Sequence, residues 1–168
     1  MPPTPGYLLN YDATAEDIGK DRLEFQFNPE EVTHQIGIAW GSHGIPGASH
    51  PRLHWGGSGS VTWAFTIQFH RLDDNVTDFV AQRVNLLESW TKAQYADDGQ
   101  VSKGPPRLLF VMGSLVNSGV SPGRIVVLRS VAVKYTLFDE DMEPRAADVE
   151  LSLEEFVRRS VDARTIRQ

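Results

Sequence analysis

Three histidines in one segment are the residues best suited to metal chemistry. His43, His50 and His54 lie within residues 41–59, GSHGIPGASHPRLHWGGSG, where glycine and proline are dense enough to predict a long loop. Three imidazoles can in principle bind zinc or nickel. A loop does not fix their spacing, however, and we therefore expect these histidines to contact a partner protein, with no bound metal.

Other patterns that carry catalysis are missing from the sequence. The glycine-flanked serines of WGGSGS and MGSL do not fit the G-x-S-x-G nucleophile motif, and no phosphate-binding glycine motif is followed by a helical pattern. The chain has no cysteine, which excludes a thiol nucleophile, a disulfide scaffold and thiolate metal sites. Paired carboxylates fall at predicted turns, where acidic residues are common. We predict no catalytic residue and no cofactor.

The composition is that of one soluble domain. The chain has 168 residues, of which 40% are hydrophobic and 23% charged, and a net charge of −6. This negative charge argues against a protein that binds nucleic acid by neutralising phosphates, so we expect no sequence-specific nucleic-acid partner. The longest apolar runs are far shorter than the ~20 residues of a membrane span, and we expect no membrane partner.

Basic charge is concentrated in residues 157–168. This segment carries Arg158, Arg159, Arg164 and Arg167 against a single acidic residue, Asp162. We divide the chain into a domain at residues 1–156 and a basic C-terminal tail at residues 157–168. The tail is either a solvated, frayed end or an arm that docks onto an acidic neighbour, and its arginines are candidates for partner contact.

Alternation of apolar and polar residues predicts strands along most of the chain. Residues 23–27 and 32–40 alternate and are expected to pair around a short turn at Asn28-Pro29. Residues 61–69 form the clearest core strand, and residues 124–138 and 147–153 alternate on either side of the turn DEDMEP. Residues 108–112 predict a short strand that is apolar on both sides, and residues 96–106 a second loop.

Only one segment has the periodicity of a helix. Apolar residues recur at helical spacing between residues 76 and 95, after an N-cap-like Asn75. A single helix cannot supply the repeated crossovers of a parallel sheet. We therefore predict a mainly β (α+β) fold, an antiparallel β-sandwich or barrel with one flanking α-helix.

The outer face of the last predicted strand is acidic. Asp148, Glu150 and Glu154 alternate with its apolar residues and would share one side of the strand. Such a row of carboxylates repels polyanions that pass over it. An ordinary solvated face fits the pattern equally well.

Several stretches, in this order, resemble the N-terminal domain of contractile injection system tube proteins. That family includes the baseplate tube-initiating proteins of contractile phage tails and related injection particles. The stretches are Phe25-Gln26-Phe27-Asn28-Pro29, Trp55-Gly56-Gly57, the turn at Asp73, Pro105-Pro106 before Phe110-Val111-Met112-Gly113, Tyr135-Thr136-Leu137-Phe138, Pro144-Arg145-Ala146 and Val149 to Leu153.

The resemblance implies a tail-tube-like fold and a structural role without catalysis. Six copies would close into a ring between a baseplate hub or spike protein and the inner tail tube, with other baseplate subunits as further neighbours. The hairpin of residues 131–138 and 145–153 would line the channel, and Asp148, Glu150 and Glu154 would then face the lumen. The particle would be a virion or an injection particle, assembled in the bacterial cytoplasm.

Two alternatives of other classes remain open. The first is a small β-sandwich module that binds glycans or another ligand, with Trp40, Trp55 and the histidines of residues 41–59 as its platform. The second is a metal-dependent hydrolase that uses the same three histidines. Loss of ligand binding in Trp55→Ala would indicate the first, and stoichiometric zinc the second.

Overall fold

A computed structural model of the chain describes residues 4–13, 21–72, 79–116 and 123–157. Within these residues the protein is mostly β, with one helix and a large antiparallel sheet, which confirms the predicted fold class. The strands are β1 (Tyr7–Asn10), β2 (Arg22–Glu24), β3 (Val32–His43), β4 (Arg52–His70), β5 (Gln94–Tyr95), β6 (Val101–Lys103), β7 (Leu108–Val111), β8 (Arg124–Phe138) and β9 (Pro144–Glu155).

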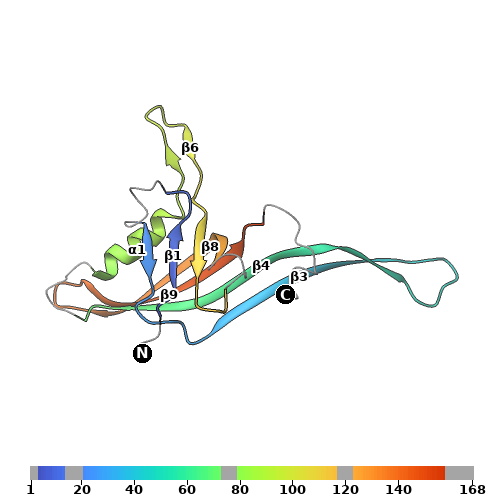
Figure 1. Ribbon diagram of the computed structural model, residues 1–168, viewed down its shortest axis with the longest axis horizontal. Coiled ribbons are helices and arrows are strands. Elements are labelled where there is room, and N and C mark those ends of the chain that lie inside the picture. The colour runs from blue at the N-terminus through green and yellow to red at the C-terminus, as the bar shows by residue number, and fades with distance from the viewer. Residues whose placement is uncertain (1–3, 14–20, 73–78, 117–122, 158–168) are drawn as a thin grey trace.

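Seven strands form one sheet in the order β2-β1-β7-β8-β9-β4-β3, and every pairing in it is antiparallel. Strands β5 and β6 form a separate two-stranded hairpin, which projects from the body in Figure 1. The long strands β8 and β9, predicted from alternation, are confirmed, and the turn between them contains Met142 at a φ of 63°.

The sheet folds over on itself, so that its two ends share one core. Phe65 of β4 stacks on Phe110 of β7 with ring centroids 5.2 Å apart, although β8 and β9 lie between these strands in the sheet order. Phe25, just after β2, lies 5.6 Å from the Phe65 ring. Aromatic pairs of this kind contribute roughly 0.5–1.5 kcal/mol beyond the area they bury. No charged or polar residue is fully buried among the described residues.

Helix α1 (Phe79–Ser89) covers the apolar face of the sheet. Val80, Val84 and Leu87 are buried and lie on one face of the helix, which packs against β8 and β9. The predicted helix over residues 76–95 is too long at its end, because Thr91 and Lys92 form hydrogen bonds to residues three positions back and close the helix with a tight turn. Its expected start at Asn75 lies outside the described residues.

Other predictions from sequence are wrong as well, and the second predicted loop, residues 96–106, contains strand β6. Residues 41–59 are not one long loop, since β3 continues to His43 and β4 begins at Arg52, which leaves only residues 44–51 between the strands. The pairing of β3 with β4 is irregular, with register shifts between Ile36 and Ile38 and between Ala39 and Trp40. Glycine permits such irregular pairing, and Gly57 takes a φ of 135° that other residues rarely adopt.

The expected pairing of residues 23–27 with 32–40 is also wrong. Strand β2 pairs with β1, whereas β3 pairs with β4 at the opposite edge of the sheet. The Asn28 side chain accepts a hydrogen bond from the Gly6 backbone N–H at 2.8 Å, which holds the connecting segment against the start of the chain. Phe27, expected on the apolar side, is 44% exposed.

Candidate functional site: a polar sheet with two open edges

One face of strands β3, β4, β9 and β8 is polar and faces away from the core. Alternate β4 residues, Trp63 to Phe69, are buried, and the residues between them, including Thr66 and Gln68, face the other way. Opposite them on β9 lie Glu150 and Asp148, because Thr66 pairs with Glu150 and Gln68 with Asp148. Cross-strand partners share a face. The sheet therefore presents a continuous surface of threonine, glutamine and carboxylate side chains.

The three predicted acidic residues do lie on this one face, with different neighbours. Glu150 is exposed, and Asp148 lies opposite Lys134 of β8 in the register. Glu154 is partly buried and forms an ion pair with Arg129, with Arg129 Nε 3.2 Å from its carboxylate. Basic residues of β8 thus offset part of the acidic charge, and the row is less negative than its sequence pattern alone predicts.

This polar sheet has a long unpaired edge on each side. Strand β3 ends the strand order, so its outer edge, 12 residues long, has no strand partner within the described chain. On the other side, β7 pairs only with Arg124 to Val126 of β8, and the remaining edge of β8 to Phe138 has no strand partner among the described residues. Long unpaired edges are templates for pairing with another chain.

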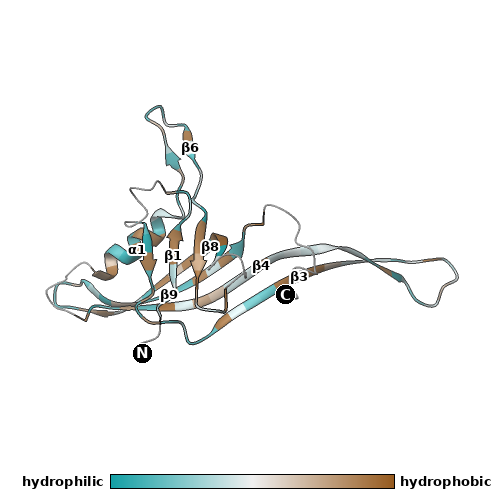
Figure 2. Cartoon of the chain, in the orientation of Figure 1, coloured by the Kyte–Doolittle hydropathy of each residue, from teal (hydrophilic) through white to brown (hydrophobic). Residues whose placement is uncertain are grey.

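Beyond the body, β3 and β4 continue together as a two-stranded arm. The pairing of β4 with β9 begins at Thr62, so the parts of β3 and β4 beyond this point pair only with each other and project from the molecule (Figure 1). Large apolar side chains of the arm are exposed, and brown, hydrophobic colour covers part of β3 there (Figure 2). They are Ile36, Ile38, Trp40, Leu53 and Trp55. Two strands without further neighbours are only marginally stable in water, so burial of these side chains against another surface would stabilise the arm.

Trp40 and Trp55 lie opposite each other in the arm and are 61% and 63% exposed. The histidines are arranged differently. His54 lies opposite Gly41 and its imidazole covers that glycine, where a Cβ atom would come within 2.3 Å of the ring. His43 pairs with Arg52, and His50 lies in the connection from β3 to β4. The described residues, which include all three histidines, bring no three potential metal ligands together.

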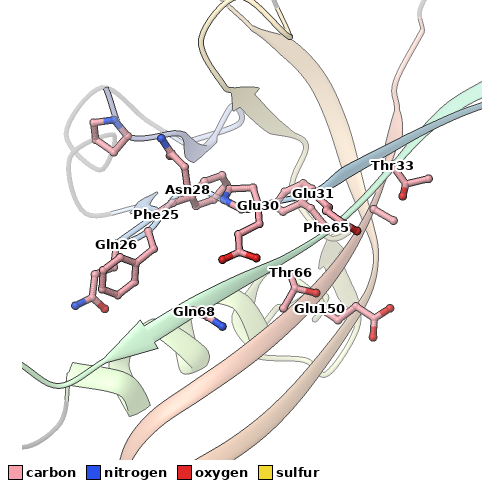
Figure 3. Close-up of a pocket in the computed structure, with 14 residues that line it drawn as sticks. Phe25, Gln26, Asn28, Glu30, Glu31, Thr33, Phe65, Thr66, Gln68 and Glu150 are labelled. Atoms are coloured by element: carbon pink, nitrogen blue, oxygen red, sulfur yellow. The ribbon is translucent and has the colours of Figure 1, made fainter. Parts of the chain in front are cut away.

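A groove lies beside β4 where β3 departs from it. The segment from Phe25 to Glu31 forms one wall, and β4 residues up to Gln68 form the other, with Glu150 of β9 below (Figure 3). The hollow has a volume of about 780 Å³. At its end the Gln26 side chain accepts a hydrogen bond from the His70 N–H at 2.7 Å and donates one to the His70 carbonyl at 2.9 Å.

Two ion-pair groups fix chain segments at the ends of strands, one at the polar sheet and one at β1 and β7. Arg71, whose side chain is 6% exposed, contacts Asp139 at 3.1 Å and Glu143 at 3.6 Å in the β8–β9 turn. Backbone N–H donation from Glu143, together with the Arg71 guanidinium, lowers the pKa of Asp139 from its usual 3.8. Elsewhere, hydrogen bonds from Arg107 lower the pKa of Asp12 from the same value. These contacts order the β8–β9 turn and the chain after β1.

The roles of Gln26 and Arg71 were not predicted from the sequence, because each side chain contacts residues more than 40 positions away in the chain. A glutamine in an alternating strand has no local signal that it will bond a distant backbone. The four arginines expected to contact partners from the tail, Arg158, Arg159, Arg164 and Arg167, lie outside the described residues. No helix among the described residues is long and apolar enough to cross a membrane.

The comparison with protein families agrees with this architecture. A family model described as contractile injection system tube protein matches residues 7–164, nearly the whole chain. The chain therefore belongs to the contractile injection system tube protein family. Its class is that of structural tube components, which assemble with other tail components into a phage tail or injection particle. No curated protein matches the chain.

Proposed function

We propose that this protein is a non-enzymatic tube-initiation protein of a baseplate, forming a hexameric ring between the spike or hub and the inner tube. The observation that carries the proposal is the polar sheet with its two open edges, β3 on one side and β8 on the other. If the β3 edge of one copy pairs with the β8 edge of the next, each sheet loses both free edges and the ring closes.

The dimensions of such a ring suit a channel. Four strands from each of six copies give about 24 strands, which at about 4.8 Å spacing make a ring with a backbone diameter of roughly 37 Å, and more if the strands tilt. The number six is taken from the family resemblance. Helix α1 occupies the apolar face, so the polar face with Asp148, Glu150 and Glu154 would line the lumen.

The arm and the tail would reach the neighbouring proteins. On this view the exposed apolar residues of the arm, together with His43, His50, His54 and Trp55, contact the hub, the tube or an adjacent baseplate subunit, and burial of their apolar surface stabilises the assembly. Each contact of this kind is an expectation for the assembled particle, which forms in the bacterial cytoplasm.

Backbone direction in β3 allows a sharp test of edge pairing. His70 bonds the Gln26 side chain on the β3 side of β4, whereas the Arg71 N–H bonds the Arg145 carbonyl of β9 on the other side. Backbone groups alternate in direction along a strand. The backbone N–H and carbonyl of Thr62 therefore point toward β3, where Gln35 is the register partner. Because the backbone of Gln35 then faces β4, the N–H of the next residue, Ile36, points to the open edge.

Proline removes one N–H donor and is tolerated on an edge strand where that N–H faces away from the sheet. We expect Ile36→Pro to fold but to lose the ring, and Gln35→Pro to lose monomer stability because it removes a bond to β4. Ile36→Ala controls for the lost side chain. Native mass spectrometry and electron microscopy of the protein with its hub partner measure the ring, and normal sixfold rings of Ile36→Pro would contradict pairing through this edge.

A further inference from the structure

The groove beside β4 exposes an unused piece of sheet edge. Strand β3 pairs with β4 only as far as Phe65, through Val32, whereas β4 continues to His70. The backbone of Gln68 faces the same side as that of His70, because the two residues are two positions apart in the strand. Among the described residues nothing bonds the Gln68 N–H or carbonyl on this side.

Gln26 shows what this edge accepts. Its amide group forms the same pair of bonds with His70, N–H to oxygen and carbonyl to nitrogen, that a neighbouring strand would form. It therefore closes the edge at His70 and leaves the stretch between Phe65 and His70 open. At about 3.3 Å per residue this stretch is roughly 16 Å long, which suits an extended segment of a few residues.

The side chains around the opening select the charge of such a segment. Glu30 and Glu31 lie on the loop wall and Glu150 below, and none of the residues that line the groove is basic (Figure 3). Within the described chain these three carboxylates form no ion pair. An extended segment that carries arginine would gain both backbone hydrogen bonds and charge-assisted ones.

We propose that the groove binds the basic segment of residues 157–168 from a second copy of the chain, added as a short strand along Gln68. This segment carries four of the chain's 16 basic residues against one acidic residue. Strand β9 runs from Ala146, opposite His70, to Glu154, opposite Thr62, and so leads away from the groove of its own copy. The inference rests on the proposed ring, which places a second copy beside the groove.

The absence of native cysteine makes disulfide capture a clean test. Glu31→Cys and Arg164→Cys variants of the 168-residue chain are mixed, assembled and oxidised. We expect a disulfide between the two copies to form on the order of tenfold faster than in a matched mixture of Glu88→Cys with Arg164→Cys, because a bound segment has a high effective concentration. Glu88 is an exposed glutamate on α1, away from the groove lining.

Charge and chain identity give two further readouts. Adding Glu30→Lys and Glu150→Lys to the Glu31→Cys chain should slow the reaction severalfold, and so should high salt. A rate equal to that of the Glu88→Cys control would overturn the inference. A second test uses one chain that carries both Glu31→Cys and Arg164→Cys, mixed with an excess of unsubstituted chain. If this chain forms only a disulfide within itself, the inference is also overturned.

Native mass spectrometry of the same samples separates the two proposals. Rings that form without capture between Glu31→Cys and Arg164→Cys would overturn the tail contact and leave the ring intact. Rapid capture between copies in samples that never form a ring would support the contact and count against the proposed tube-initiation ring.

Discussion

Phe65 and Phe110 stack nearly parallel, at an interplanar angle of 13°, and join strands from the two halves of the folded sheet. Trp63 adds an edge contact to Phe110, with ring centroids 6.0 Å apart, and the His34 ring stacks on Trp63 at 4.2 Å. This aromatic group is the point at which β4, β7 and the arm strand β3 meet. Substitutions around it separate effects on folding from effects on assembly.

The buried and exposed tryptophans of β4 are expected to behave oppositely. Trp63 is 3% exposed, and Trp63→Ala should lower the free energy of unfolding by about 3–5 kcal/mol. Trp55 is 63% exposed, and Trp55→Ala should change it by less than about 0.5 kcal/mol while weakening assembly. Urea unfolding of both variants measures the first quantity, and native mass spectrometry the second.

The same Trp55→Ala variant tests the glycan-binding alternative. Loss of binding on a glycan array by Trp55→Ala, with normal entry into the baseplate, would contradict the assembly role of the arm. Large destabilisation of the isolated Trp55→Ala chain would show that the arm is packed on its own body.

A glycine next to Phe110 is expected to tolerate no side chain. A Cβ atom at Gly123 would lie 2.5 Å from the Phe110 backbone oxygen and 2.7 Å from a Val111 methyl group. The Phe110 backbone would have to shift to make room, so Gly123→Ala should lower the free energy of unfolding by about 1–3 kcal/mol. Gly104 has no atom within 4 Å of its Cβ position, and Gly104→Ala is the matched control. Equal midpoints of thermal unfolding for the two variants would refute this account.

Gln26 is expected to stabilise the end of β4. Gln26→Ala leaves the N–H and carbonyl of His70 without the partners that the glutamine supplies, which should cost about 1–3 kcal/mol. Gln100→Ala, at an exposed turn, should be close to neutral. Urea denaturation of the two variants at pH 7 gives the comparison, and a neutral Gln26→Ala would show that solvent replaces the glutamine fully.

Acid should destabilise the protein in a defined direction. The folded-state pKa values of Asp12 and Asp139 lie below the usual 3.8, so the folded state binds fewer protons than the unfolded state as the pH falls. The stabilisation by these carboxylates is complete above the unfolded value of 3.8 and is lost as the pH falls through their lower folded pKa values.

Asp12→Asn isolates one of these groups. The variant should be less stable than the original chain at pH 7, and its stability should fall less steeply below about pH 4, because it lacks the carboxylate that Arg107 contacts. Asp97→Asn, at an exposed turn without an ion pair among the described residues, is the control substitution. Urea midpoints measured from pH 6 to pH 2.5 provide the test, which fails if Asp12→Asn and the original chain have parallel profiles.

Alternation in the sequence determined which residues of β4 from Trp63 to Phe69 and of β9 are buried, because a two-residue period fixes the face of each side chain locally. In β8 it did not, since Tyr135 and Leu137 alternate with polar residues and yet are exposed. It also placed Asp148, Glu150 and Glu154 on one face. The lack of cysteine excluded thiol chemistry, and the negative net charge argued against binding through phosphate neutralisation. These are properties that each residue carries by itself or with its immediate neighbours.

The tertiary structure alone decided which strands pair and which edges stay open. A period of two says nothing about a strand's partner, so β2 was expected beside β3 although the sheet places them at opposite edges. Likewise, glycine and proline density in residues 41–59 indicated a loop, whereas pairing between Trp40 and Trp55 extends both strands into an arm. Partner choice depends on long-range packing, and the groove closed by Gln26 and His70 arises only after that choice is made.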